Sequence, residues 1–274
     1  MQASTHQNVQ TSHGRIAVET RGEGFPVIFI HGNSACQEVF RKQISSPLLD
    51  GYHLISFDLP GHGASDDASD SDRTYSRPGL ADLVVELLGK LGISRAAIVG
   101  ASLGGHIAIE MLARSGISRG QFLMGTPAVG DNFAEGFRGK PLNGLASRGE
   151  LTSEEARQFA RVVFGNEFEP FMQMAIERTD RRFRTKLFAA SAKGSGVNQR
   201  EMLASTSTST AIVNGEHDQI VNLDYIDRVP YANLWRGKYF RIPEATHSPF
   251  WEVPHVVNLL LSEFLKELTG RRKA

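Results

Sequence analysis

Short apolar segments alternate along this chain with longer segments of helical periodicity. The apolar segments contain few polar positions, which is typical of strands that are covered on both faces of a parallel sheet. Such strands are predicted at 26–30, 53–57, 95–99, 121–124, 210–213 and 238–242. Residues 9–10 and 16–20, on either side of His13 and Gly14, predict an antiparallel hairpin at the edge of the sheet.

Helical segments connect these strands. Residues 80–91, 103–114 and 253–268 carry apolar side chains at every third or fourth position, so each segment predicts a helix with one buried face. The repeated order of strand, helix and strand predicts an α/β fold, with a mostly parallel central sheet and flanking helices.

One long segment has no strand pattern. Thr152 and Glu155 have the spacing of a capping box, which marks the start of a helix, and residues 169–178 and 181–190 predict two more helices. We therefore expect residues 130–199 to form a helical cap inserted after the sixth strand, and residues 1–129 and 200–274 to form the core. A run of basic residues in the cap predicts a solvated helix face, with an anion site as the alternative: Arg178, Arg181, Arg182, Arg184 and Lys186.

Charge and composition argue against several classes of protein. The chain has 274 residues, and its 30 Lys and Arg balance 30 Asp and Glu, which argues against a partner such as nucleic acid or an anionic membrane. We expect no signal peptide, and no apolar run reaches the ~18 residues that span a bilayer. Cys36 is the only cysteine, so neither a disulfide within the chain nor a cysteine-based zinc site can form. We expect a cytoplasmic monomer that acts on a small molecule without a metal or other cofactor.

The sequence Gly-Ala-Ser-Leu-Gly at 100–104 matches the pattern G-x-S-x-G between a predicted strand and a predicted helix. In that context the serine stands on a sharp turn at a helix N-terminus, where backbone N–H groups can stabilise developing negative charge. We expect Ser102 to be a nucleophile. The alternative is a glycine-rich turn with an incidental serine.

A serine nucleophile needs a general base and an acid that orients it, and in this fold the acid precedes the histidine along the chain. His247 follows the last predicted strand, in a loop at the sheet edge where catalytic groups gather, and is the expected base. The acid is expected in the loop after 210–213, where Asp218 is preferred and Glu216 competes; Asp131 is a weaker third candidate.

Two backbone N–H groups should form an oxyanion hole. One belongs to Leu103, directly after the nucleophile, and the other to Asn33, in the loop with Gly32 that follows the strand at 26–30. We expect several other side chains of this region to be structural: His31, Cys36, His62 and His106.

These motifs together resemble the α/β-hydrolase superfamily over essentially the whole chain. A closer resemblance, to the AidH-type N-acyl homoserine lactonases, is carried by the following segments: 11–18, 30–34, 102–107, 109–111, 125–127, 178–180, 198–200, 233–235 and 237–238. These lactonases are metal-independent and quorum-quenching. The resemblance implies Ser102 as nucleophile, His247 as base, Asp218 as acid, and Asn33 with Leu103 at the oxyanion.

Two positions depart from the family. Asp218 stands where the family carries glutamate, so its loop must approach the histidine more closely. Phe159 falls in the cap where a relative can carry tyrosine, and the missing hydroxyl removes a polar contact to the substrate.

The function expected from this resemblance is opening of the lactone ring of N-acyl homoserine lactones. The first alternative is a general carboxylesterase, and a less favoured one is a ligand receptor on a hydrolase fold. Apolar residues of the cap could wall a tunnel for the acyl chain or only pack the cap onto the core: Phe159, Val163, Phe164, Phe168, Phe171, Met172 and Met174.

Overall fold

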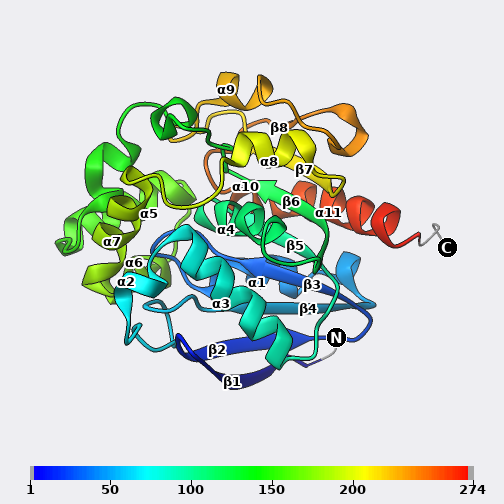
Figure 1. The fold of residues 1–274 in the computed structure, drawn as a ribbon, viewed down its shortest axis with the longest axis horizontal. Helices are drawn as coiled ribbons and strands as arrows, with labels where there is room; N and C mark the ends of the chain where they lie inside the picture. Colours follow the sequence, from blue (N-terminus) through cyan, green and yellow to red (C-terminus); the bar gives the residue numbers. More distant parts are fainter. Residues whose placement is uncertain (1–2, 271–274) are drawn as a thin grey trace.

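A central sheet of eight strands organises the computed structural model, which describes residues 3–270 (Figure 1). The strand order is β1-β2-β4-β3-β5-β6-β7-β8; β1 and β2 pair in antiparallel fashion, β2 also runs antiparallel to β4, and the other neighbours are parallel. The strands are β1 (Thr5–Thr11), β2 (Gly14–Arg21), β3 (Phe25–Ile30), β4 (Tyr52–Phe57), β5 (Ala96–Ala101), β6 (Ser118–Met124), β7 (Ser209–Gly215) and β8 (Phe240–Ile242). The predicted α/β fold, with its edge hairpin and its parallel strands, is confirmed.

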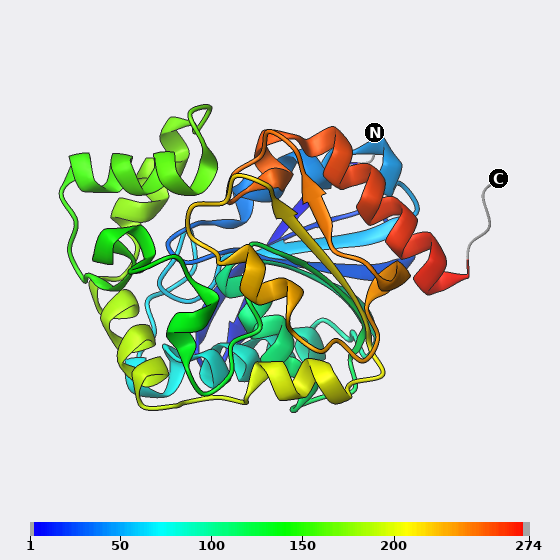
Figure 2. The ribbon, with the colours of Figure 1, turned by 90° about the horizontal axis from the view of Figure 1, so that it is seen from above.

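Helices cover both faces of the sheet. They are α1 (Arg41–Ile44), α2 (Ser71–Thr74), α3 (Arg77–Lys90), α4 (Leu103–Leu112), α5 (Ser153–Phe164), α6 (Pro170–Arg178), α7 (Arg181–Ala192), α8 (Gln199–Ser205), α9 (Leu223–Asp227), α10 (Pro249–Glu252) and α11 (Pro254–Thr269). Figure 2 shows α11 along one face and α3, α4 and α8 along the other. No helix within the described part of the chain has the length and apolar character to cross a membrane.

The alternation of side chains along each strand produces a core on each face. In β3, Val27 and Phe29 pack in one cluster with side chains of α11, whereas Ile28 and Ile30 pack in the other with side chains of α3 and α4. Because both faces of the sheet are buried, the strands are continuous apolar segments. The sequence pattern predicts them for this reason. The strand β8 begins two residues later than predicted, because its pairing with β7 starts at Phe240; Lys238 is extended but follows directly on the 3-10 turn at Trp235–Gly237.

Helices α5, α6 and α7 lie together to one side of the sheet, beyond the ends of its strands (Figure 1). The capping box of α5 is present, because the Thr152 hydroxyl accepts from the Glu155 N–H and the Glu155 carboxylate accepts from the Thr152 N–H. Two 3-10 segments, η3 (Phe133–Gly136) and η4 (Pro141–Ser147), precede these helices. The limits of the cap at 130 and 199 stay a prediction.

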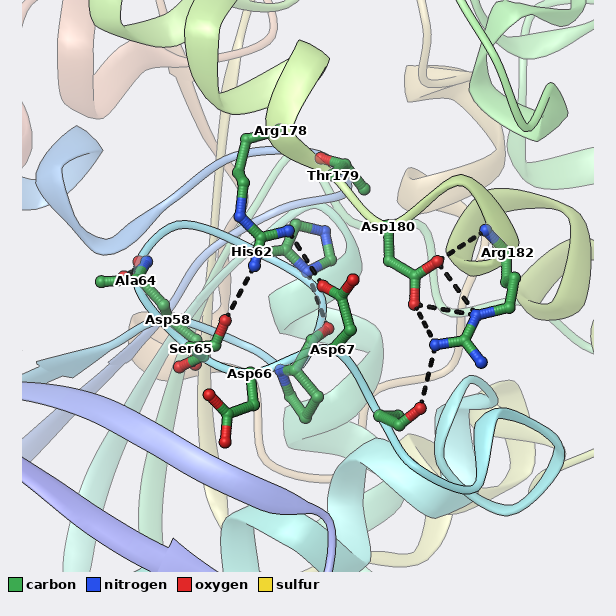
Figure 3. A network of polar contacts seen from close by, with 12 residues as sticks. Asp58, His62, Ala64, Ser65, Asp66, Asp67, Arg178, Thr179, Asp180 and Arg182 are labelled. Carbon is green, nitrogen blue, oxygen red and sulfur yellow. Dashed lines mark hydrogen bonds and ion pairs between the residues drawn. The ribbon is translucent and has the colours of Figure 1, made fainter.

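Basic residues of the cap bind the loop that follows β4 (Figure 3). Arg178 donates to the Asp67 carboxylate and to the Ser65 carbonyl. Both oxygen atoms of the Asp180 carboxylate accept from Arg182, and one of them also accepts from the Tyr75 hydroxyl at 2.6 Å. These contacts attach α6 and α7 to the core.

The prediction of a solvated basic face is wrong for Arg184, which is only 2% exposed. Its guanidinium donates to the Ser34 hydroxyl at 2.8 Å and to the Gly149 carbonyl at 2.6 Å. Burial lowers the pKa of Arg184 to about 10. The side chain therefore ties the cap to the loop after β3 and uses its donors on protein oxygen atoms.

Candidate active site

Ser102 occupies a strained turn between β5 and α4. Its backbone has φ 53° and ψ −116°, a conformation that non-glycine residues rarely adopt, and its N–H donates to the Met124 carbonyl at 2.8 Å. The neighbouring glycines permit close packing around the turn. A Cβ on Gly104 would lie 1.9 Å from the Ile30 carbonyl oxygen, and one on Gly105 would lie 2.1 Å from the Thr126 hydroxyl. The turn therefore holds the Ser102 side chain at the N-terminus of α4, as the motif predicts.

His247 and Asp218 are hydrogen-bonded to each other. His247 Nδ1 lies 2.8 Å from Asp218 Oδ2, and both side chains are buried. The second oxygen of Asp218 accepts from the N–H groups of Ile220, at 2.8 Å, and Val221, at 3.0 Å. Burial by itself would raise the pKa of Asp218, but the attraction of His247 and these hydrogen bonds outweigh it, so the pKa is lowered. The carboxylate is therefore ionised and fixed against the imidazole.

The two loops that carry this pair lie against each other. A Cβ on Gly215, at the end of β7, would be 1.9 Å from the Thr246 carbonyl oxygen, one residue before His247. The other two acid candidates are directed elsewhere: Glu216 is exposed, and Asp131 is exposed and accepts from Asn198 at 3.1 Å. Among the acids considered, Asp218 is the one that contacts His247.

The loop after β3 lies directly on the serine. A Cβ on Gly32 would lie 3.3 Å from the Ser102 Cβ. The Asn33 amide donates to the Ala146 carbonyl at 3.0 Å and accepts from Ser34, so this side chain holds the loop. Within the described residues, the backbone N–H groups of Asn33 and Leu103 donate to no protein acceptor. Both groups are therefore free to bind an oxyanion.

The remaining polar side chains near the loops are occupied by the fold. The His31 ring bonds the Gly32 carbonyl and accepts from the Leu59 N–H, and His62 lies between the Pro60 carbonyl and the Ser34 N–H. Burial raises the pKa of the Cys36 thiol to about 12, so this thiol is not a nucleophile at neutral pH.

One cavity brings the predicted site residues together. It is lined by Gly32, Asn33, Ser102, Leu103, Phe159 and His247. Its other walls are mostly apolar: Val39, Phe133, Phe137, Leu142, Val163, Phe164, Leu187, Phe188, Ile220 and Phe250. Further polar side chains also line it: Arg77, His106, Ser191 and Ser248.

The two alternatives for the apolar residues of the cap, a cavity wall and packing of the cap, hold for different residues. Phe159 and its neighbours Val163 and Phe164 do line the cavity. Met172, on α6, is buried in a hydrophobic cluster; Phe171 packs on Trp251 with ring centroids 5.8 Å apart; Met174 is 59% exposed. Phe133 and Phe137 were not predicted to line the cavity, because they lie in an irregular segment without periodicity.

The positions of the possible metal-ligating side chains can be checked throughout residues 3–270. Over residues 3–270, no group of three or more His, Cys, Asp and Glu side chains is placed to hold a metal ion. The cavity presents a serine hydroxyl, an imidazole and two backbone N–H groups, and the Asp218 carboxylate lies behind the imidazole.

The sequence and the fold of this chain are both similar to those of known hydrolases. Residues 27–258 match the family described as the alpha/beta hydrolase family. Among curated proteins, the AB hydrolase superfamily protein YisY of Bacillus subtilis is 25% identical over 92% of this chain and 96% of its own length. Carboxylesterase CesB of the same organism has a similar fold at 17% identity, with a TM-score of 0.78 over 96% of this chain and 92% of its own.

Structures of N-acyl homoserine lactonase AidH are much more similar. A serine-to-glycine mutant of AidH complexed with N-hexanoyl homoserine lactone is 38% identical, with a TM-score of 0.95 over 98% of this chain and 100% of its own. AidH complexed with N-butanoyl homoserine is 39% identical, with the same TM-score over 98% and 99% of the two chains. A glutamate-to-glycine mutant complexed with N-hexanoyl homoserine matches at 38% identity and a TM-score of 0.95, over 99% and 100%.

Proposed function

This chain belongs to the alpha/beta hydrolase family, and we propose that it is a serine hydrolase that opens the ring of N-acyl homoserine lactones. The observation that carries the proposal is the likeness to AidH, which extends over 98% of the chain at 38% identity and so includes the cap as well as the core. Because cap residues line the cavity beside Ser102, similarity in the cap bears on the substrate and not only on the fold.

The ligands of the AidH structures support a lactone as substrate. The serine-to-glycine mutant is complexed with the intact lactone, whereas AidH without a named mutation is complexed with the ring-opened N-butanoyl homoserine. This chain has a serine on the corresponding type of turn and a cavity with apolar walls that suit an acyl chain.

Ser102 begins the proposed reaction by attacking the carbonyl carbon of the lactone, while His247 Nε2 takes the hydroxyl proton. Asp218 accepts from His247 Nδ1, fixes the tautomer in which Nε2 is free to act as base, and stabilises the imidazolium. The negative oxygen of the tetrahedral intermediate binds the N–H groups of Asn33 and Leu103.

Collapse of this intermediate breaks the bond between the carbonyl carbon and the ring oxygen. His247 gives its proton to that oxygen, which becomes a hydroxyl still attached to the acyl group. A water molecule then gives a proton to His247 and attacks the ester of Ser102. The second collapse returns the proton to Ser102 and releases N-acyl homoserine, so the net reaction adds one water. Removal of the lactone in this way would quench a quorum signal.

The decisive experiment is mass spectrometry of N-octanoyl homoserine lactone after incubation with the protein, beside a Ser102→Ala control. A product heavier by one water that closes again on acidification is expected, and only with the serine present. Octanoate together with homoserine lactone would instead show an acylase that uses the same residues.

Two other outcomes would replace the proposal. An intact lactone with cleavage of p-nitrophenyl butyrate would favour a general carboxylesterase. Very slow turnover with a large rise in melting temperature on lactone binding would favour a ligand receptor.

A further inference from the structure

His106 is a second histidine at the cavity that the proposed reaction does not use. It lies in the second turn of α4, whose N-cap is Ser102, and both side chains line the same cavity. Its ring stands beside two aromatic walls of the cavity, with centroids 6.2 Å from Phe133 and 6.3 Å from Phe137. His106 is therefore placed where the substituent of a substrate held at Ser102 would extend.

Gln199 fixes the tautomer of this ring. The Gln199 Nε2 donates to the backbone carbonyl of His106 at 3.1 Å, which orients the amide because a carbonyl oxygen can only accept. The amide oxygen consequently faces His106 Nδ1, at 2.7 Å, and this nitrogen must carry the proton. Gln199 begins α8, which packs beside α4 (Figure 1), and its side chain is fully buried, so the pair is held rigidly.

The other nitrogen of His106 opens on the cavity. Nε2 has no hydrogen-bond partner among the described residues, yet it is not one of the side-chain atoms sealed from solvent, and His106 lines the cavity. Burial and the nearby positive charge of Arg77 lower the pKa of His106 to about 3, so the ring is neutral at physiological pH. With the proton on Nδ1, the lone pair of Nε2 presents a hydrogen-bond acceptor.

The Arg77 guanidinium is directed mainly at the fold and not at the cavity. Its Nη2 donates to the Ser195 carbonyl at 2.8 Å, and its Nε lies 3.9 Å from the Glu110 carboxylate. The two nitrogens without a hydrogen bond, Nε and Nη1, are sealed from solvent and so cannot reach a ligand in the cavity. Ser191, on α7, also lines the cavity, but a hydroxyl can donate or accept and does not discriminate between ligands.

We propose that His106 determines specificity by accepting, at Nε2, a hydrogen bond from a donor on the acyl part of the substrate. Two groups of an N-acyl homoserine lactone are such donors: the amide N–H, and a hydroxyl at carbon 3 of the acyl chain. A keto oxygen at carbon 3 would bring two acceptors together and be rejected. This inference rests on the proposed function and names the class of acyl group that the site prefers.

The test compares kcat/KM for lactones of one chain length. The substrates are N-octanoyl, N-(3-hydroxyoctanoyl) and N-(3-oxooctanoyl) homoserine lactone, together with the octanoyl ester of α-hydroxy-γ-butyrolactone, which has an ester oxygen in place of the amide N–H. The proteins are the wild type, His106→Phe, and Val163→Ala as a control that changes an apolar wall of the same cavity.

If the hydroxyl is the donor, the wild type prefers the 3-hydroxy over the 3-oxo substrate by about tenfold, and His106→Phe reduces that ratio to about two or less. If the amide is the donor, His106→Phe lowers kcat/KM by about tenfold for all three amides and leaves kcat/KM for the ester unchanged. The wild type itself then has a lower kcat/KM for the ester than for the amides. Val163→Ala changes neither ratio.

Ratios that His106→Phe leaves unchanged would overturn the inference. Circular dichroism and the melting temperature show whether this variant folds, since it removes the partner of a buried amide. If it does not fold, the wild type decides: a protein that neither prefers the 3-hydroxy over the 3-oxo substrate nor loses activity on the ester overturns the inference. A wild type that opens no lactone refutes the proposed function instead.

Discussion

Asp218→Asn tests the proposed triad most sharply, because the structure fixes how the new amide must point. Two N–H groups, those of Ile220 and Val221, donate to one carboxylate oxygen, so the amide oxygen of asparagine will keep that position. Its NH₂ group then faces His247 Nδ1, 2.8 Å away, and donates to it. The imidazole is driven into the tautomer with a proton on Nε2, which cannot accept the proton of Ser102.

The expected loss is about 10⁴-fold in kcat, or ~5.5 kcal/mol of transition-state stabilisation, as for a triad with the wrong tautomer. The melting temperature should change little, since asparagine has nearly the same shape and keeps the backbone contacts. The assay is initial-rate hydrolysis of N-octanoyl homoserine lactone or of p-nitrophenyl butyrate, with Ser102→Ala as the baseline.

Glu216→Gln is the matched control, because this neighbour in the same loop is exposed and was the competing acid candidate. It should keep full activity. The reasoning is refuted if Asp218→Asn retains activity within tenfold of the wild type, or if Glu216→Gln is the variant that loses it.

Three further predictions follow from packing and charge. Gly105→Ala should lower the free energy of unfolding in urea by ~1–3 kcal/mol, because the new Cβ would lie 2.1 Å from the Thr126 hydroxyl. Gly89→Ala should instead raise it by up to ~1 kcal/mol, because Gly89 is on the exposed side of α3 and a Cβ there meets no atom within 4 Å. Equal effects of the two substitutions would contradict this packing. The Cys36 thiol, with its pKa raised to about 12 by burial, should react with Ellman's reagent only after unfolding, and rapid labelling of active enzyme would show the burial to be wrong. The pKa of Asp180 is lowered to about 2, because the hydrogen bonds from Arg182 and Tyr75 outweigh the effect of burial. Folding therefore favours the ionised carboxylate. The wild type should lose more stability than Asp180→Asn as the pH falls from 3.8 to about 2. Parallel stability curves for the two proteins would refute the role of that carboxylate.

The sequence determined the sheet and the serine turn, because both depend on local patterns. Strands buried on both faces must be apolar throughout, and this showed in β3, β4, β5, β6 and β7. The turn at Ser102 requires small neighbours at fixed positions, so five residues were enough to identify it. Short helices such as α2 and α9 were missed, since four or five residues carry too little periodicity.

Packing decides which carboxylate contacts His247. The sequence placed Asp218 and Glu216 in the same loop, and their side chains have the same chemistry. Their difference arises because the loop after β7 packs on the loop that carries His247, which buries one carboxylate and leaves the other in solvent.

Tertiary structure also decided which polar side chains serve the fold and which face the cavity. Arg184 belongs to a basic run whose sequence suggests a solvated helix face, but it is buried because the cap meets the loop at Ser34. His106 presents an acceptor to the cavity only because Gln199, more than ninety residues away, occupies its other nitrogen. Local sequence specifies elements through propensity and periodicity, whereas burial, tautomer and partner depend on contacts between segments distant in the chain, and a linear pattern does not record these.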